Sequence, residues 1–156
     1  MRLKDKVAII TGGARGIGKK ISQTFLKEGA SVYIFDVNQE EGAGTAGELR
    51  PLHWHIIEQG KLDITDEKSV EQSIEKIIEA EGRIDILVNN AGITRDNLIL
   101  RMSLEDWKKV IDINLTGAFI CSKHTARYMV KNRSGKIINI SSIAGVHGNA
   151  GQSNYS

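Results

Sequence analysis

The sequence predicts an α/β fold in which one doubly wound parallel sheet carries helices on both faces. Four short runs are almost continuously apolar and rich in β-branched residues, which is typical of parallel strands covered on both faces. Helix-like apolar spacing lies between these runs, and alternating strands and helices form right-handed crossovers. The predicted strands are Val7–Ile10, Val32–Phe35, Ile84–Val88 and Ile137–Ile140.

Three helices are expected between these strands. The first begins inside a glycine cluster, and the second ends near Gly82. The third starts at Ser103, whose hydroxyl can cap the amide of Asp106, and runs to about Val130. The apolar positions of the three helices are, in order, Ile17, Ile21, Phe25 and Leu26; Val70, Ile74, Ile77 and Ile78; and Leu104, Trp107, Val110, Ile111, Leu115, Ala118 and Phe119.

The stretch from Glu40 to Leu62 has weaker signals. Three glycines disfavour a helix and Pro51 would end one, so we expect a short helix followed by an irregular strand. His53 and His55 would share one strand face, as a metal-binding pair does. Zinc needs three or four ligands and no third one is evident nearby, so we interpret the pair as edge-strand packing and expect no metal site.

Composition indicates a globular protein of one domain spanning residues 1–156. Of the 156 residues 40% are hydrophobic and 26% are charged, and the net charge of +2 comes from basic residues scattered among acidic ones. This pattern argues against nucleic-acid and membrane partners. The apolar run near the N-terminus is too short for a signal peptide, which predicts a cytoplasmic protein. Cys121, the single cysteine, is expected to be a small buried side chain.

A glycine-rich loop directly follows the first predicted strand. Residues 11–18 read TGGARGIG, with glycines in the spacing GxxxGxG. A strand that turns sharply into a helix presents amide N–H groups and the positive end of the helix dipole to a pyrophosphate. Gly12 and Gly16 would permit its close approach, and Gly18 would let the helix pack on the sheet. With a strand before and a helix after, the loop predicts dinucleotide binding over a purely structural turn.

The second predicted strand ends in Asp36, 18 residues after Gly18. A carboxylate at this place can accept hydrogen bonds from both hydroxyls of the adenosine ribose, which favours NAD. It would repel the 2′-phosphate of NADP, whereas Arg15 in the glycine loop would attract that phosphate. The sequence therefore favours NAD, with NADP as the alternative. A strand-end turn is the alternative role of Asp36.

Four ordered motifs carry a resemblance to a known family. They are the GxxxGxG loop, the run Asn89-Asn90-Ala91-Gly92, Asn114 in Asn-Leu-Thr-Gly, and Ser142 followed thirteen residues later by Tyr155. In this combination the whole chain resembles the short-chain dehydrogenases/reductases, which have a Rossmann-like fold. The segments 92–98 and 148–152 are most similar to the 3-oxoacyl-(acyl-carrier-protein) reductases of bacterial fatty-acid synthesis.

The resemblance implies further contacts with the coenzyme. Asp63 would bind the adenine amino group, Ile64 would add a backbone contact, and residues 90–92 would line the adenosine ribose. A strand-end position leading into a helix at Asp66 is the alternative for Asp63, and a turn-stabilising role is the alternative for Asn90. The full expected cofactor-binding set is Gly12, Arg15, Gly16, Ile17, Gly18, Asp36, Asp63, Ile64, Asn90, Ala91 and Gly92.

The resemblance also implies three catalytic residues. Tyr155 would be the general acid/base, Ser142 would orient and polarise the carbonyl, and Asn114 would hold a water molecule in a proton relay. Reduction of a ketone by hydride needs such an acid, because negative charge develops on the carbonyl oxygen. The structural alternatives are a helix-bending hydrogen bond for Asn114, a turn cap for Ser142 and an exposed aromatic for Tyr155.

The resemblance extends beyond the last residue of the sequence. A tyrosine has a pKa of about 10 and needs a nearby positive charge to act near neutral pH. The family supplies a lysine four residues after the tyrosine, at position 159, so we expect little or no turnover by residues 1–156 alone. Without the family's later strands, Ile137–Ile140 would form a sheet edge and one face of the 103–130 helix would be uncovered.

The full-length protein is expected to be a homotetramer that reduces a 3-oxoacyl thioester on acyl carrier protein. Arg133 matches a basic position that meets the acidic carrier protein in such reductases, or is a solvated loop residue. One alternative substrate is another ketone or alcohol, such as a sugar, a steroid or a small alcohol. A non-catalytic dinucleotide-binding protein is the alternative of a different class, and the retention of Asn114, Ser142 and Tyr155 argues against it.

Overall fold

The computed structural model describes residues 1–38 and 62–156. Four parallel strands form one sheet in the order β2-β1-β3-β4. The predicted doubly wound α/β fold is therefore confirmed. The helix and strand expected in the Glu40–Leu62 stretch fall on residues 40–61, which lie outside the described residues together with His53 and His55. The strands are β1 (Val7–Thr11), β2 (Ser31–Phe35), β3 (Ile86–Asn89) and β4 (Lys136–Asn139).

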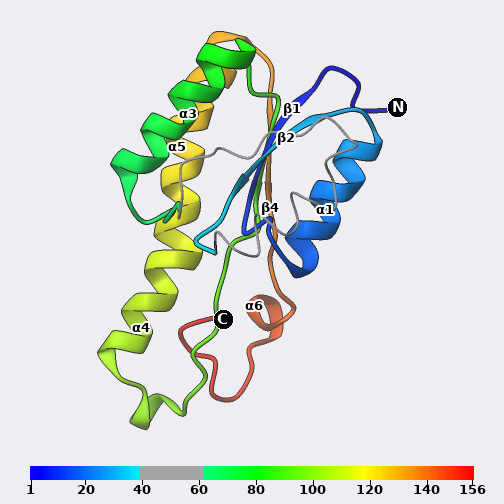
Figure 1. Cartoon of the computed structure of the whole chain (residues 1–156). Coiled ribbons are helices and arrows are strands. Elements are labelled where there is room, and N and C mark those ends of the chain that lie inside the picture. The colour runs from blue at the N-terminus through cyan, green and yellow to red at the C-terminus, as the bar shows by residue number, and fades with distance from the viewer. Residues whose placement is uncertain (39–61) are drawn as a thin grey trace.

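Helices cover both faces of this sheet, with α1 on one face and α3 and α5 on the other (Figure 1). A π-helical segment, Asp112–Gly117, joins α4 to α5, so that one long helix follows the loop after β3. In the described part of the chain, no helix is long and apolar enough to cross a membrane. The helices are α1 (Gly16–Lys27), α3 (Glu67–Glu81), the 3-10 turn η1 (Ile99–Arg101), α4 (Leu104–Ile111), α5 (Ala118–Lys131) and α6 (Ala144–His147).

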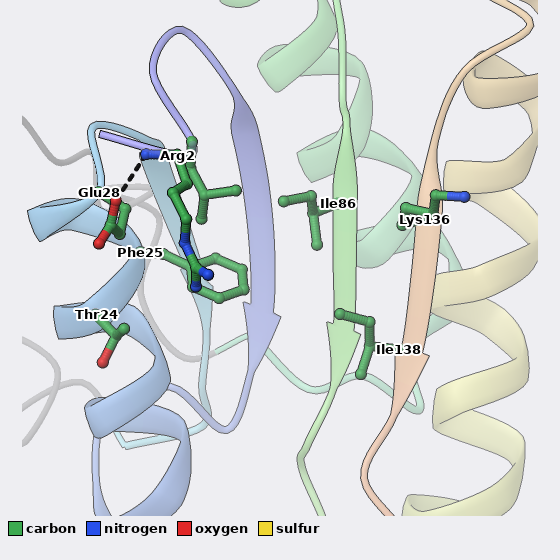
Figure 2. Close-up of a pocket in the computed structure, with 8 residues that line it drawn as sticks. Arg2, Thr24, Phe25, Glu28, Ile86, Lys136 and Ile138 are labelled. Carbon is green, nitrogen blue, oxygen red and sulfur yellow. Dashed lines mark hydrogen bonds between the residues drawn. The ribbon is translucent and has the colours of Figure 1, made fainter.

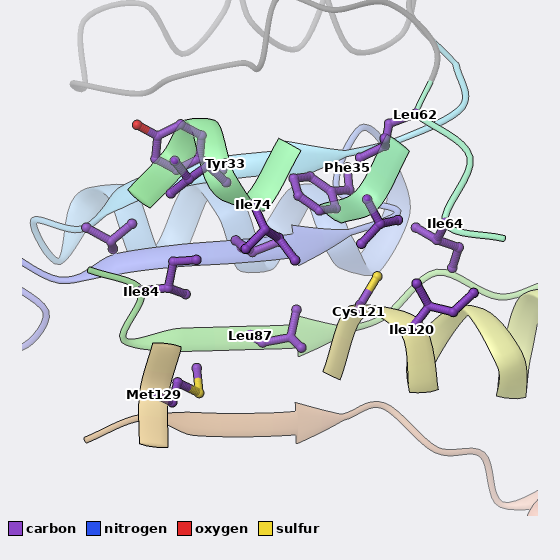
Figure 3. Close-up of a cluster of buried hydrophobic side chains, with 14 residues drawn as sticks. Tyr33, Phe35, Leu62, Ile64, Ile74, Ile84, Leu87, Ile120, Cys121 and Met129 are labelled. Carbon is purple, nitrogen blue, oxygen red and sulfur yellow. The ribbon is translucent and has the colours of Figure 1, made fainter. Parts of the chain in front are cut away.

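Alternate side chains of the inner strands enter two separate cores. Ile9 packs with Phe35 and Leu87 beneath α3 and α5 (Figure 3), whereas Ile10 packs with Val32 on the α1 side. Because both faces are covered, β1 and β3 are apolar at almost every position and read as continuous runs in the sequence. Burying one such side chain contributes about 1.5–3 kcal/mol. The two cores together hold the carboxyl ends of β1 and β3 side by side.

Cys121 lies inside the larger core. Its side chain is fully buried, and burial raises the pKa of the thiol to about 12. The thiol therefore stays protonated at neutral pH. The expectation of a small buried side chain is confirmed.

β4 lies at one edge of the described sheet and differs from the other three strands, including β2 at the opposite edge, because its side chains are exposed. All four of its residues are exposed, and Ile138 retains 42% of its accessible surface. The predicted sheet edge is confirmed, and the expectation that every strand is covered on both faces is wrong here. On the α1 side, Phe25, Ile86 and Ile138 line an apolar groove, with Arg2 and Lys136 also lining it (Figure 2).

The predicted strand β3 begins two residues too early. Ile84 is buried but precedes the strand, which begins at Ile86. Between them Asp85 uses its side chain to join the amino ends of β1 and β3, because its carboxylate accepts a hydrogen bond from the Val7 backbone amide at 3.0 Å. The apolar run therefore marks burial and does not mark where strand pairing starts.

Asp85 is a buried carboxylate that accepts four hydrogen bonds from three residues. Arg83 donates from Nε at 2.9 Å and also from Nη2, Lys6 donates from Nζ at 3.3 Å, and Val7 donates its amide. Burial pushes the pKa of this carboxyl upward, but these hydrogen bonds outweigh it and hold the pKa below its ordinary value. The ionised form is thus the one that stabilises the fold.

Replacing Asp85 by Ala should lower the free energy of unfolding by about 1–3 kcal/mol at pH 7, because it leaves the buried Val7 amide without its acceptor and removes the carboxylate that the half-exposed Lys6 and Arg83 contact. In the wild type this contribution is fully present above the unfolded pKa of about 3.9, and it is lost as the pH falls through the lower folded pKa. Urea denaturation at several pH values measures both effects. Lys123→Ala, which breaks an exposed pair with Glu67, is the control, and equal losses in the two variants would contradict the prediction.

Candidate active site

The strand order creates a switch point, the place where an open parallel sheet forms its ligand crevice, at the carboxyl edge of the sheet. β2 and β3 lie on opposite sides of β1, so the chain leaves β1 in one direction first and crosses to the other side later. In open parallel sheets, ligands bind outside the carboxyl ends of the strands where the order reverses in this way. The glycine loop after β1 and the Asn90–Gly92 turn after β3 both lie there.

The three glycines of the loop have different surroundings. Gly12 and Gly16 have φ angles of 63° and 53°, in the left-handed region. A Cβ on Gly12 would lie 2.9 Å from Ala91 Cα, and one on Gly18 would overlap the Gly12 carbonyl oxygen. A Cβ on Gly16 would meet no atom within 4 Å. Gly12 and Gly18 therefore let the loop and α1 pack closely, and Gly16 faces the open side of the crevice.

Arg15 and Ile17 flank Gly16 at the amino end of α1. Arg15 is the N-cap residue with extended backbone, and no acidic side chain lies in the first turn. Ile17 is 66% exposed, so its predicted place on the buried stripe of this helix is wrong. The buried residues of α1 begin at Gly18, and the Ile17 side chain points away from the sheet. Both side chains border the surface where a phosphate would approach.

One hydroxyl group joins the two loops of the crevice. Thr11, at the end of β1, accepts hydrogen bonds on Oγ1 from the amides of Asn90 at 3.0 Å and Ala91 at 2.9 Å. In return Asn90 Nδ2 donates to the carbonyl oxygens of Thr11 and Gly12 at 3.0 and 3.1 Å. Asn90 therefore has the turn-stabilising role that the sequence left open. Thr11 was not predicted, although a lone hydroxyl ending an apolar strand was the available signal.

Asp36 connects β2 to the glycine loop. Its Oδ2 accepts a hydrogen bond from the Ala14 amide, and its Oδ1 accepts one from the Asn38 amide, both at 3.0 Å. The carboxylate therefore lies beside the loop, in the place expected for a ribose contact. These bonds also give it the turn role that was the alternative.

Asp63 and Ile64 lie where the chain enters α3. Asp63 is exposed, and its Oδ1 accepts hydrogen bonds from the amide and hydroxyl of Thr65 at 2.9 and 2.7 Å. The N-cap of α3 is Asp66, the residue where the sequence placed this helix. Ile64 has its side chain in the core, where a Cβ on Gly117 would lie 2.6 Å from its Cδ1. Gly117 is thus a packing requirement that the sequence analysis missed.

Asn114 lies in the π-helical segment between α4 and α5. Its Oδ1 accepts a hydrogen bond from the Ile93 amide and its Nδ2 donates to the Ile93 carbonyl, both at 2.9 Å. The side chain therefore clamps the loop after β3 and does not bond to its own helix, so the helix-bending alternative is wrong. The uninterrupted α-helix predicted from Ser103 to Val130 is also wrong at its centre, and π segments of this kind are frequent at functional sites.

The structure bears on two predictions for the long helix that follows η1: the N-cap at Ser103 and the burial of its apolar positions. Ser103 Oγ accepts a hydrogen bond from the Asp106 amide at 3.0 Å, as predicted. Val110 is buried, whereas Leu115 and Phe119 are more than 60% exposed. Within the described residues this confirms the uncovered helix face that the sequence predicted.

Ser142 and Tyr155 stand on a loop that folds back on itself after β4. Ser142 Oγ accepts a hydrogen bond from the Ala144 amide at 3.3 Å, which gives it the turn-capping role that was the alternative. Tyr155 is half-buried, and its amide donates to the Gln152 carbonyl at 3.0 Å. A Cβ on Gly145 would lie 3.8 Å from the Ser156 carbonyl oxygen, so the end of the chain lies beside α6 (Figure 1). The loop thus brings the segments of both residues to the carboxyl edge.

These features define an α/β protein with a nucleotide-type crevice at the switch point of a parallel sheet. The chain matches the short chain dehydrogenase family over residues 6–156 and belongs to it. It is therefore a member of a family of oxidoreductases.

Several curated relatives carry one name, 3-oxoacyl-(acyl-carrier-protein) reductase FabG. The chain is 44% identical to that of Thermotoga maritima over 99% of its residues and 42% identical to that of Aquifex aeolicus over 100%. It is 44% identical to that of Escherichia coli over 99% of its residues. The chain spans 62–63% of the length of these relatives.

Replacing Thr11 by Val keeps the size of the side chain but removes the acceptor of two buried amides. The free energy of unfolding should fall by about 1–3 kcal/mol, the cost of leaving such groups unsatisfied. Thr11→Ser keeps the hydroxyl and is the matched control. Chemical denaturation of both variants measures the difference, and equal stabilities would show that the hydroxyl does not join the loops.

Proposed function

We propose that the full-length protein is an NAD(P)H-dependent 3-oxoacyl-(acyl-carrier-protein) reductase and that residues 1–156 contain most of its coenzyme site. The observation that carries the proposal is the 42–44% identity with reductases of that name over almost the whole chain. The crevice supports it, because Asn114, Ser142 and Tyr155 all belong to segments at or beside the carboxyl edge of the sheet. The substrate would be a 3-oxoacyl thioester on acyl carrier protein.

The residues of the crevice fit a dinucleotide. Gly16 leaves open space at the amino end of a twelve-residue helix whose first turn contains no acidic side chain, which suits a pyrophosphate. Asp36 would bind the adenosine ribose, and Asp63 with Ile64 would bind the adenine. Ala91 and Gly92 would border the same ribose, beside the turn that Asn90 holds. The coenzyme, when bound, supplies the hydride.

Tyr155 would donate its phenolic proton to the substrate oxygen as negative charge develops there. Ser142 would donate a hydrogen bond to the same oxygen and orient it. Asn114 would hold the relay water while its amide bonds to Ile93, because Oδ1 and Nδ2 each keep one further hydrogen-bonding position. Asn114 also acts by fixing the loop and by shaping the helix around it.

The test measures oxidation of NADH and NADPH by the full-length gene product with an acetoacetyl thioester. Tyr155→Phe should lower kcat by about a thousandfold, within the range of general acid catalysis, because it removes only the proton donor. The Kd for the coenzyme should stay unchanged. Assayed in parallel, residues 1–156 alone should bind coenzyme with little turnover, because position 159 is absent from them.

Two results would overturn this function. Coenzyme binding without thioester reduction by the wild type would point to another ketone or alcohol, or to a non-catalytic binding protein. Full activity of Tyr155→Phe would remove the tyrosine from the mechanism.

The proposed preference for NAD rests on the charge of Asp36. Asp36→Asn keeps an oxygen that can accept from the Ala14 amide but removes the negative charge. It should strengthen NADPH binding by about tenfold, or ~1.4 kcal/mol, and weaken NADH binding. Arg15→Ala should change the preference in the opposite direction. Dissociation constants from coenzyme fluorescence measure both, and an unchanged ratio in Asp36→Asn would show that the carboxylate does not select the coenzyme.

A further inference from the structure

Residues 151–154, just before Tyr155, are bound to the loop that follows β3. The Asn97 amide donates to the Gly151 carbonyl at 2.8 Å, and Gln152 Nε2 donates to Asp96 Oδ2 at 3.0 Å. Asn154 Nδ2 donates to the Arg95 carbonyl at 2.9 Å. Two irregular segments nearly sixty residues apart in sequence are therefore joined along their length beside the candidate active site.

Asn154 differs from the other residues that make these contacts because it is buried. Only 5% of it is exposed, whereas Asp96 and Asn97 are exposed. Its Oδ1 is buried with no hydrogen-bond partner among the described residues. An unsatisfied buried acceptor costs free energy that an apolar side chain of the same size would not cost. The bond from Nδ2 to Arg95 is thus the one favourable polar contact that this amide makes in the described structure.

The Arg95 carbonyl belongs to a loop segment that Asn114 holds in place. Arg95 follows Ile93 by two residues, and Asn114 binds both the amide and the carbonyl of Ile93. On the other side, the amides of Tyr155 and Ser156 both donate to the Gln152 carbonyl, at 3.0 and 2.8 Å. This turn fixes the Tyr155 backbone relative to Asn154. A continuous set of contacts therefore runs from Asn114 through the loop to Tyr155.

We propose that Asn154 is a positioning residue, which fixes the Tyr155 phenol over the site by bonding its own amide to the Arg95 carbonyl. The inference rests on the proposed function, in which Tyr155 donates the proton. A displacement of about 1 Å at a reacting group costs on the order of a hundredfold in rate. Loss of the Asn154 bond would free the 152–156 turn to move by such an amount without removing any group that touches the substrate.

The test compares Asn154→Leu with Ser153→Ala in the full-length gene product. Leu has the same number and branching of side-chain heavy atoms but no donor, and Ser153 is an exposed neighbour whose hydroxyl lies 3.8 Å from the Met102 sulfur. Asn154→Leu should lower kcat roughly 10- to 100-fold with an unchanged Kd for the coenzyme. Ser153→Ala should keep the wild-type kcat. A wild-type kcat in Asn154→Leu would overturn the proposal.

A second variant separates positioning from general stability. In Asn154→Asp an ionised carboxylate would face the Arg95 carbonyl without a proton to donate, whereas the protonated acid can donate one. Its kcat relative to the wild type should therefore rise several-fold as the pH falls from about 8 to about 5, since burial favours the neutral form. A constant ratio across this range would overturn the role of the donor.

Hydrogen exchange keeps this inference separate from the proposed function. If the wild type does not reduce the thioester, the proposed function fails. The exchange rates of the Tyr155 and Ser156 amides still measure whether the bond from Asn154 to the Arg95 carbonyl holds the turn. Their exchange should be at least about tenfold faster in Asn154→Leu than in Ser153→Ala, because an open turn loses its protection. Equal exchange in the two variants would overturn the positioning role whether or not the protein is active.

Discussion

The crevice depends on the junction between Thr11 and the Asn90–Ala91 turn. Two parallel strands end side by side, and the backbone amides beyond the end of β3 have no further strand to pair with. One hydroxyl accepts two of these amides, and one carboxamide returns two bonds to the carbonyls of residues 11 and 12. The glycine loop can stay close to this turn because Gly12 and Gly18 have no Cβ. The shape of the crevice is therefore set by buried hydrogen bonds before any ligand arrives.

The loop after β3 receives support from two further elements. The π-helical segment binds it through Asn114 at Ile93, and the segment before Tyr155 binds it through Asn154 at Arg95. The Asn114 carboxamide both donates to and accepts from Ile93, whereas among the described residues the Asn154 carboxamide only donates, to the Arg95 carbonyl. The irregular loop after β3 is thus held by side chains from a helix and from a turn. Such supporting contacts keep the residues of a site in a defined geometry.

Much of this arrangement was predictable from the sequence. Continuous apolar runs predicted the parallel strands, and a short polar side chain before an apolar pattern predicted the N-cap at Ser103. The π segment was not predictable, because a shift of one hydrogen bond barely changes the spacing of apolar residues. The spacing of apolar residues also does not tell which of them another element covers. Ile17 was therefore predicted to be buried, but it is exposed. The contacts of Asn154 join irregular segments distant in sequence, and no local pattern reports them.

The π segment also has a consequence for how this region tolerates changes in length. A π turn holds one more residue than the α turn it replaces, and each residue of an α-helix advances the rotation by about 100°. Deleting a single residue between positions 112 and 117 would let the segment close into regular α-helix while α5 stays packed on the sheet. The flanking helices would keep their relative orientation, because the α turn completes the same rotation with one residue fewer, but the backbone at Asn114 would be repositioned and the loop that carries Ile93 would lose its partner. Substitutions can be absorbed here far more easily than a change of one residue in length.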